Sequence, residues 1–411
     1  MKMNVVVIGA QWGDEGKGKI VDYLADRSDV VVRFSGGANA GHTIVAGETT
    51  YKLHLVPSGI VYPNTLNILG SGMVIDVEEL YKELTGLSEQ GLEWHGRVFI
   101  SERAHVVLPR HKQQDLEMDA KRATPIGTTG RGIGVAYAEK AHREGIRIAE
   151  ITNPTQFAQL RKEDKDHLLP YVDKIREMSI DITAFMAQNK DKQVLFEGAQ
   201  GILLDIDIGT YPFVSSGYSS AAGAAAGGGI GPRALDKVLG VCKAYSTRVG
   251  NGPFPSEFTA ERDGDLEHTV RETGREYGVT TGRPRRCGYL DLVALKYACR
   301  ANSIDFLVLT HIDVYDSMDK VQACVAYKHG ETLIESFPAS AKVLEESEPV
   351  TETFDGWNQS ICDVEEYESL PEQTRNYIRF IEDYTETPIG IVSVGYRRDQ
   401  TIIRQDPWIR S

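Results

Sequence analysis

The chain has 411 residues, of which 41% are hydrophobic and 25% are charged, a balance typical of folded proteins and not of disordered ones. Its formal net charge of -14 argues against a nucleic-acid or anionic-membrane partner, because the summed field would repel either. The five cysteines are odd in number and lack C-x-x-C spacing, so we expect no disulfide framework and no zinc site. The N-terminus lacks a signal-peptide pattern, which together with the cysteines favours a cytoplasmic protein.

Short apolar runs recur along the chain and predict strands that are covered on both faces, because their apolarity is continuous and does not alternate. These runs are residues 5–8, 30–34, 66–69, 98–100, 194–196, 238–241, 306–309 and 389–394. Helical periods lie between several of them, such as the single apolar stripe of Ile175, Met178, Ile182, Phe185 and Met186. This alternation predicts an α/β fold: one large domain, residues 1–411, with a central, mostly parallel sheet flanked by helices.

Glycine or polar residues follow five of these runs, and ligands of open α/β sheets bind beyond the carboxyl ends of the strands. We therefore expect one ligand site at those ends. The low-complexity stretch 219–232, SSAAGAAAGGGIGP, separates a motif from a predicted strand. We expect it to form a close-packed glycine and alanine loop or helix start, in preference to a flexible linker.

The first motif, GDEGKGK at residues 13–19, satisfies seven positions of the phosphate-loop pattern G-x-x-x-x-G-K-[ST]. Ile20 stands where that pattern has a magnesium-binding hydroxyl. The glycines would let the backbone approach phosphates and Lys17 would neutralise charge, although a glycine-rich turn before a helix fits these residues almost as well. Asp14 favours function, because a carboxylate in a phosphate loop is costly unless it binds a cation or removes a proton.

Three further loops carry polar groups that suit phosphates or bases. SGGANAGHT (35–43) offers Asn39 and His42, and IGTTGRGIG (126–134) offers hydroxyls, amides and Arg131, with Arg143 one short helix later. FEGAQG (196–201) places Gln200 directly after a strand. Each also has a plain structural interpretation, as a glycine loop with a surface histidine, an ordinary turn, or a bend in the chain.

Two later segments carry positive charge and a motif that could recognise a nucleotide base. GVTTGRPRRC (278–287) concentrates three arginines whose forked guanidinium groups suit carboxylates and phosphates, in a loop that could act as a lid or could be a solvated basic turn. THID (310–313) is similar to the [NT]-K-x-D signature of GTP-binding proteins, with His311 in place of the lysine. Four residues alone also fit a polar turn after a strand.

The segments QWGDEGKGK, NAGHT, IGTTGRGIG, FEGAQG, TTGRPRR and THID occur together in this order. That set closely resembles the adenylosuccinate synthetase family, and the likeness runs from Asn4 to the C-terminal SVGYRR. The resemblance implies a GTP-dependent, Mg²⁺-dependent ligase that joins IMP to L-aspartate, giving adenylosuccinate, GDP and phosphate. It also implies a single-domain α/β homodimer and two chemical steps, phosphorylation of O6 of IMP followed by displacement of that phosphate by the aspartate amine.

By the same resemblance, the catalytic residues are Asp14, which takes the N1 proton, His42, Lys17 and Gln200. The magnesium ligands are Asp14 and the Gly41 carbonyl. IMP would be bound by Asn39, Thr129, Gln200, Ser215, Arg283 and, from the other subunit, Arg143. Aspartate would be bound by Val279, Thr280, Thr281, Arg283 and Arg285. GTP would be bound by Gly13, Glu15, Gly16, Lys17, Gly18, Gly41, His42, Thr43, Arg285, His311, Asp313, Ser393 and Gly395.

Some positions depart from the family's usual pattern. His311 replaces a common lysine, Ser215 replaces a threonine, and Pro284 stiffens the arginine loop. The stretch between Arg143 and Gln200 looks shorter than in many relatives. Two alternatives stay open: a ligase of the same family that acts on a guanylate, which Asp14 would crowd at the 2-amino group, and a GTP-binding switch, which would release phosphate without IMP or aspartate.

Overall fold

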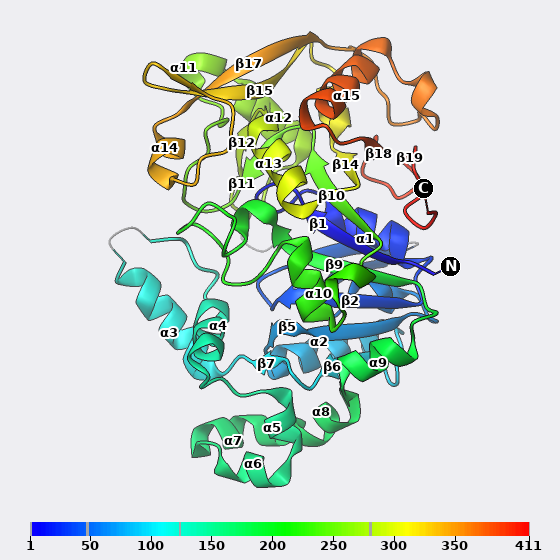
Figure 1. The fold of residues 1–411 in the computed structure, drawn as a ribbon, viewed down its shortest axis with the longest axis vertical. Helices are drawn as coiled ribbons and strands as arrows, with labels where there is room; N and C mark the ends of the chain where they lie inside the picture. Colours follow the sequence, from blue (N-terminus) through cyan, green and yellow to red (C-terminus); the bar gives the residue numbers. More distant parts are fainter. Residues whose placement is uncertain (1, 47–48, 123–124, 279–281, 411) are drawn as a thin grey trace. The chain divides into compact units, whose positions relative to one another are not determined.

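The computed structural model describes residues 2–46, 49–122, 125–278 and 282–410. The chain, whose helices and strands are labelled in Figure 1, groups into two compact units, each assembled from separate stretches of sequence. The first unit holds residues 1–7, 18–199 and 215–237, and the second holds residues 8–17, 200–214 and 238–411. The interpretation of residues 1–411 as a single domain stays a prediction.

The first unit is built on a parallel sheet in the order β1-β9-β2-β5-β6-β8, with β7 beside β5. The pairs β2–β5, β2–β9, β5–β6, β5–β7 and β6–β8 are all parallel, and β3 and β4 form a separate antiparallel pair. Its strands are β1 (Asn4–Gly9, whose last two residues belong to the second unit), β2 (Val30–Gly36), β3 (His42–Ala46), β4 (Thr49–Leu53), β5 (Leu66–Ile75), β6 (Val98–Ser101), β7 (His105–Val106), β8 (Ser179–Ile180) and β9 (Val194–Gly201).

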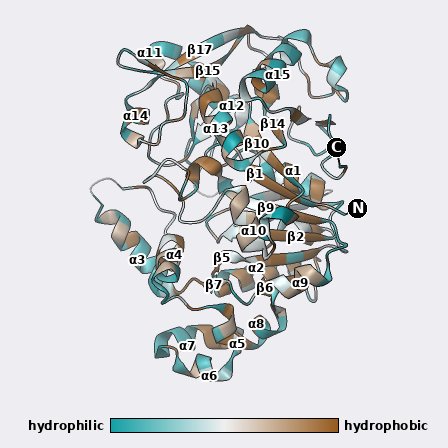
Figure 2. Cartoon of the chain, in the orientation of Figure 1, coloured by the Kyte–Doolittle hydropathy of each residue, from teal (hydrophilic) through white to brown (hydrophobic). Residues whose placement is uncertain are grey.

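Ten α-helices accompany these strands among the described residues, and an amphipathic face of α2 packs into an apolar core of this unit. They are α1 (Lys17–Ala25), α2 (Val77–Glu89), α3 (Pro109–Ala120), α4 (Ile133–His142), α5 (Ile148–Thr152), α6 (Pro154–Gln159), α7 (Lys162–Leu168), α8 (Val172–Met178), α9 (Ile182–Gln188) and α10 (Ala221–Gly228). Figure 2 shows the strands mostly in the hydrophobic colour and α6 and α7 mostly in the hydrophilic one.

The single helical stripe expected over residues 175–186 is wrong. The chain forms two helices there, α8 and α9, with the short strand β8 between them. Ser179 pairs with Ile100 of β6, and Asp181 then begins α9 by accepting the backbone N–H groups of Thr183 and Ala184. The strand pairing of Ser179 and the helix cap at Asp181 thus divide the segment into two helices, although its apolar residues have the spacing of one helix.

The low-complexity stretch forms the helix α10, which packs on β2 and β5. A methyl group on Gly227 would lie 2.1 Å from the Phe34 carbonyl oxygen, so the helix backbone touches the strand directly. The expectation of a close-packed glycine and alanine helix start is confirmed.

The second unit contains the sheet order β10-β14-β18-β19, in which β10–β14 and β14–β18 are parallel and the edge strand β19 is antiparallel. A second sheet joins β13, β15, β16 and β17, and β11 pairs with β12. The strands are β10 (Lys237–Lys243), β11 (Ser246–Arg248), β12 (Arg286–Gly288), β13 (Leu290–Asp291), β14 (Phe306–Thr310), β15 (Lys320–His329), β16 (Thr332–Ile334), β17 (Glu348–Asp355), β18 (Ile389–Ser393) and β19 (Thr401–Ile403). The helices are α11 (Ala260–Asp263), α12 (Leu266–Gly274), α13 (Leu292–Asn302), α14 (Ala341–Glu345) and α15 (Glu372–Thr385).

Each apolar run that predicts a strand coincides with one, except that the run 389–394 extends one residue past β18, and the α/β class with a mostly parallel sheet is confirmed. In the described ranges, the helices lack the length and apolar character that crossing a bilayer requires.

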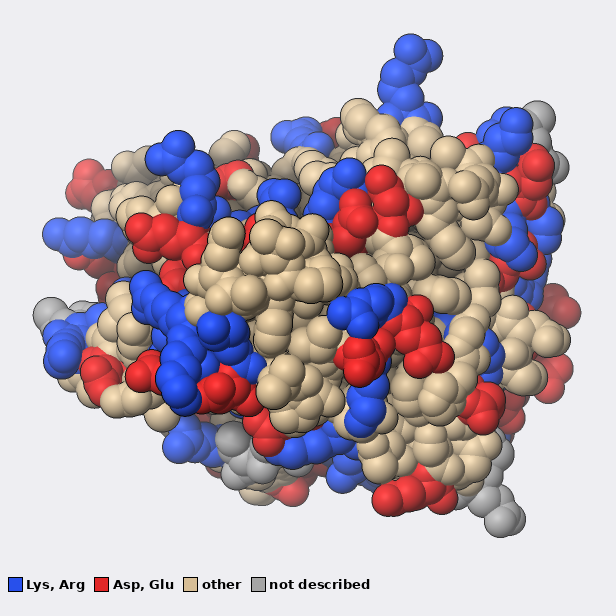
Figure 3. Space-filling view, turned by 90° about the horizontal axis from the view of Figure 1, so that it is seen from below, with Lys and Arg blue, Asp and Glu red and all other residues tan. Residues whose placement is uncertain are grey.

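Acidic and basic side chains are interspersed over the face drawn in Figure 3.

Candidate functional site

The phosphate-loop motif begins with a tight loop that leads from β1 to the start of α1, and residues 8–17 of this segment belong to the second unit. Gly13, Asp14 and Gly16 have φ of 89°, 58° and 81°, a conformation that glycine adopts easily and aspartate rarely. A methyl group on Gly201 of β9 would lie 2.2 Å from the Gln11 carbonyl oxygen, so this strand packs directly against the loop. The structure confirms a glycine-rich loop that leads into a helix.

Glu15 and Lys17 hold the loop in shape from inside. Glu15 is fully buried, and its Oε1 accepts the backbone N–H groups of Gln11 (3.1 Å) and Gly13 (2.9 Å). Its Oε2 lies 2.5 Å from Nζ of Lys17, whose side chain is 5% exposed. The charge of Lys17 is therefore compensated within the motif, which lets a lysine be buried beside the loop.

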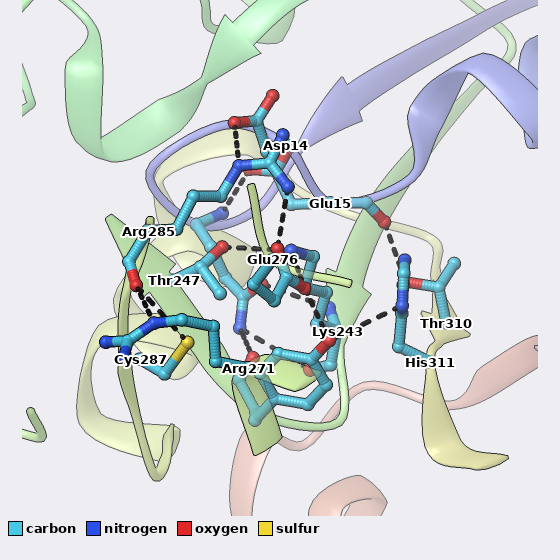
Figure 4. Close-up of polar contacts among 12 residues, drawn as sticks. Asp14, Glu15, Lys243, Thr247, Arg271, Glu276, Arg285, Cys287, Thr310 and His311 are labelled. Atoms are coloured by element: carbon cyan, nitrogen blue, oxygen red, sulfur yellow. Dashed lines mark hydrogen bonds and ion pairs between the residues drawn. The ribbon is translucent and has the colours of Figure 1, made fainter. Parts of the chain in front are cut away.

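The Asp14 side chain points to Arg285, as Figure 4 shows. Its Oδ2 lies 2.8 Å from the Arg285 Nε, and 44% of the aspartate side chain is exposed. The same guanidinium donates from Nη1 to Oε2 of Glu276, at 2.8 Å. Asp14 is thus an accessible carboxylate in a phosphate loop, held by one arginine.

Glu276 lies at the centre of a buried polar cluster. Lys243 donates to its Oε1 at 2.6 Å, and the Tyr245 hydroxyl also donates to that oxygen. Burial alone would raise the pKa of Glu276, but Lys243, with smaller effects of His311 and Tyr245, lowers it to about 2. The glutamate therefore stays charged at neutral pH.

The loops after β14 and β18 belong to the same unit. The Thr310 hydroxyl donates to the Glu15 carbonyl at 2.7 Å, and a methyl group on Gly16 would lie 3.4 Å from Nε2 of His311. These contacts bring the start of THID next to the phosphate loop. The half-buried Asp313 follows in a short helical turn, Ile312–Tyr315.

At the end of β18, the buried Ser393 donates its hydroxyl to the Gly395 carbonyl at 3.1 Å. A methyl group on Gly395 would lie 2.3 Å from Oε1 of Gln400, so a side chain at this position would displace the Gln400 amide.

Gln200 lies within β9, which continues to Gly201, so the expectation that it follows the strand is wrong. Its φ of 59° bends the strand locally. Its side-chain Nε2 is buried and has no hydrogen-bond partner within the described part of the chain. Because a buried donor of this kind normally has a partner, the amide is suited to an oxygen of a ligand.

In the first unit, His42 begins β3 and faces a buried carboxylate. Its Nδ1 lies 2.7 Å from Oε1 of Glu197, and Oε2 of Glu197 accepts the Ser58 backbone N–H at 2.8 Å. Burial would raise the pKa of Glu197, but His42 and the buried Arg33 lower it. A carboxylate on Nδ1 fixes the ring and leaves Nε2 to act on a ligand.

The loop at residues 126–132 is less available to phosphate than its composition suggests. The Asp119 carboxylate accepts the backbone N–H groups of residues 126, 127 and 128, at 3.0 to 3.2 Å. Arg131 lies 3.5 Å from Glu79. Those three amides therefore fit the ordinary-turn interpretation, whereas Thr129 is exposed.

The remaining predicted residues of the first unit are spread over several loops. Asn39 accepts the Gly37 N–H at 3.3 Å, Gly41 is exposed, and the Thr43 backbone pairs with Lys52. Arg143 is exposed and ends α4 with a φ of 68°. Gly18 lies in α1 and the half-buried Ser215 precedes α10.

The arginine loop is closed at its base by backbone hydrogen bonds from Arg285 to Glu276 (2.9 Å) and from Gly278 to Arg283 (2.8 Å). Arg283 is exposed. The predicted aspartate-binding residues Val279, Thr280 and Thr281 lie outside the described residues.

Sequence reasoning missed Glu197, Glu276 and Lys243 as parts of these arrangements. A signal existed for Glu197, because a lone carboxylate in the apolar run VLFEG must find a buried partner. The partners of Glu276 are brought together only by the fold, since Lys243 is 33 residues away in sequence.

Comparison with known proteins adds independent evidence. The family model of adenylosuccinate synthetase matches residues 6–167 and 161–402. The adenylosuccinate synthetases of Clostridium novyi (strain NT) and Moorella thermoacetica are each 46% identical to this chain, over 97% and 98% of it and over 98% and 99% of their own lengths.

Two solved structures are similar as well. The fully ligated adenylosuccinate synthetase from Plasmodium falciparum is 40% identical, with a TM-score of 0.91 over 98% of this chain and 99% of that one. The succinoaminodeoxyadenylate synthetase of cyanophage S-2L shares the fold at 20% identity, with a TM-score of 0.64 over 99% of this chain and 97% of that one. The resemblance inferred from the motifs is confirmed, and the chain belongs to the adenylosuccinate synthetase family.

Proposed function

We propose that this chain uses GTP to join IMP and L-aspartate, forming adenylosuccinate, GDP and phosphate on the way to AMP. Family membership supports the reaction. The observation in this chain that carries the chemistry is the accessible carboxylate of Asp14 inside a phosphate loop.

The reaction must overcome two obstacles in IMP. The lactam oxygen O6 is a poor nucleophile, and hydroxide is a poor leaving group. Asp14 takes the proton from N1 and moves charge onto O6, which attacks the γ-phosphoryl group of GTP. The aspartate amine then attacks C6 and displaces phosphate, so the second obstacle is removed by the first step. One positioned acid or base is worth about 10² to 10⁴ in rate.

His42 and Gln200 contact oxygen atoms of the substrates. With Nδ1 facing Glu197, the imidazole presents Nε2 to the phosphates and then to O6 as charge moves. The amide of Gln200, whose buried Nε2 has no hydrogen-bond partner among the residues that the structure describes, holds O6. Lys17 steadies the transferring phosphoryl group while Glu15 keeps it in place.

Magnesium fits the donor set of the phosphate loop. Mg²⁺ prefers oxygen ligands and is commonly held by one or two carboxylates together with substrate phosphates. We assign the Asp14 carboxylate and the Gly41 carbonyl as its protein ligands, which explains why Ile20 can replace the usual hydroxyl. Bound there, the ion would neutralise charge on the phosphates of GTP.

Asp313 gives the selectivity for GTP. Its carboxylate accepts from N1–H and the 2-amino group of guanine, and Ser393 and Gly395 line the base pocket with His311. ATP would meet a mispaired edge, a mismatch that can cost roughly 10⁴ to 10⁵ in discrimination.

The other assignments follow the family. Asn39, Thr129, Ser215 and Arg283 bind IMP, and the segment from Val279 to Arg285 binds aspartate. The enzyme works as a homodimer in which Arg143 reaches the IMP of the other subunit. Five free thiols, four of them buried, support a cytoplasmic location.

A turnover assay across GTP or ATP and IMP or guanylate, always with aspartate, tests this function. We expect product from GTP with IMP only. Equal rates with guanylate would favour the same-family alternative. Phosphate release from GTP alone would favour a switch protein and would contradict the proposal.

A further inference from the structure

Arg285 is shared between two carboxylates of the second unit, and only one of them has a role in the proposed reaction. Its Nε lies 2.8 Å from Asp14 and its Nη1 lies 2.8 Å from Glu276. Asp14 is 44% exposed, whereas Glu276 is 1% exposed. The second partner is therefore the fixed one of the two.

A backbone hydrogen bond joins the same two residues, Arg285 and Glu276. The Arg285 N–H donates to the Glu276 carbonyl at 2.9 Å, so the two residues face each other at the base of the loop 277–284. The Arg271 Nε donates to the Arg285 carbonyl at 3.1 Å, which holds the backbone just before β12 as well. Arg285, at the base of the proposed aspartate-binding loop, is thus fixed with its guanidinium next to Asp14 of the phosphate loop (Figure 4).

Hydrogen bonds from two other residues hold Glu276 in place. Lys243 donates to it at 2.6 Å and to the Thr247 hydroxyl at 3.0 Å, and the Tyr245 hydroxyl donates to the same glutamate oxygen. The four charges of this cluster, two cationic and two anionic, balance. Without the glutamate, Lys243 would lose its carboxylate partner and Arg285 would keep only the partly solvated Asp14.

We infer that Glu276 is a positioning residue, which anchors one edge of the Arg285 guanidinium so that the other edge stays at Asp14. An arginine side chain loses much rotamer freedom when it is ordered, and a fixed bond at one nitrogen supplies that order before any ligand binds. Glu276 thereby connects the phosphate loop with the base of the aspartate loop. The kinetic consequence of this arrangement depends on the proposed function, but the arrangement itself does not.

The first test uses ligand-free protein with ¹⁵N-labelled arginine. A protected Nε–H resonance that disappears in Arg285→Lys belongs to Arg285. We expect it to be lost in Glu276→Gln and kept in the matched control Glu267→Gln, which removes an ion pair of Arg271 on α12 and leaves Glu276 intact. An unchanged resonance in Glu276→Gln would overturn the inference.

Glu276→Gln leaves Lys243 without its carboxylate and could prevent folding. The double variant Lys243→Met with Glu276→Gln removes the buried charge as well, and the same loss of the Arg285 resonance is expected from it. Retention of the resonance in the folded double variant would also overturn the inference.

The second test separates positioning from a general loss of folded enzyme. We expect the KM for aspartate to rise about tenfold or more in Glu276→Gln while kcat changes by less than about threefold. A fall in kcat with unchanged KM would indicate a structural role only and would contradict the inference. If the unsubstituted chain itself makes no product, the proposed function fails, and the resonance test still decides the role of Glu276.

Discussion

Asp14 combines three properties that rarely occur together at one residue: a place in a phosphate loop, a left-handed backbone and an accessible charge. The sequence alone indicated that this carboxylate needs a function, because phosphate repels it. It also indicated Arg285 as a residue of the arginine loop that suits carboxylates and phosphates. It could not indicate Glu276 or Lys243 as the support behind them, because buried ion pairs between distant segments leave no local pattern.

Asp14→Asn should lower kcat by about 10² to 10⁴-fold, because the amide cannot take the N1 proton. The melting temperature should change little, since a half-exposed ion pair contributes only about 1 kcal/mol or less. Steady-state kinetics and thermal unfolding measure both effects. Asp173→Asn, at an exposed position on α8, is the control, and a near-normal kcat in Asp14→Asn would refute the assigned role.

Through Glu276, the stability of the protein should decrease at acidic pH. Its pKa is lowered from 4.5 to about 2 in the folded state, so the folded protein binds fewer protons than the unfolded chain in that range. The stabilisation is complete above pH 4.5 and is lost as the pH falls toward 2. At 1.36 kcal/mol per pKa unit the full loss is about 3 kcal/mol.

Urea unfolding between about pH 6 and about pH 3 measures this loss. We expect the stability of the unsubstituted chain to fall more steeply than that of Glu276→Gln over the acid part of the range. Parallel curves for the two proteins would show that Glu276 does not have a lowered pKa.

At the scale of elements, the strands were predictable because buried parallel strands are continuously apolar. The two-helix arrangement of α8 and α9 was not, because one capping aspartate and one strand partner outweigh an apolar period. The extent of β9 was underestimated for a related reason. Its last residues break the apolar run, Gln200 has a φ of 59°, and the backbone of Gly201 packs against the phosphate loop, which no local pattern indicates.

The contact between α10 and β2 gives a prediction at this scale. Gly227→Ala should destabilise the protein by about 1–3 kcal/mol or more, because the new methyl group would lie 2.1 Å from a carbonyl oxygen. Gly231→Ala is the matched control, since a methyl group there meets nothing within 4 Å, and it should change stability by about 0.5 kcal/mol or less. Equal unfolding midpoints in urea for the two variants would contradict the close packing.

At the scale of the whole molecule, the proposed dimer can be tested by mixing subunits. Arg143→Ala and Asp14→Asn should each be nearly inactive alone. In a random mixture, half the dimers contain one of each, and each such dimer has one intact site, so about one quarter of the activity should return. No recovery after unfolding and refolding the two variants together would show that Arg143 does not act on the other subunit.

The central claim is that Asp14 turns O6 of IMP into the atom that attacks GTP. The most direct measurement follows that oxygen, using IMP labelled with ¹⁸O at position 6, GTP and aspartate. If O6 is phosphorylated and then displaced, the label must leave with the γ-phosphate, so mass spectrometry should find ¹⁸O in the inorganic phosphate. Unlabelled phosphate, with the ¹⁸O released into water, would contradict the account.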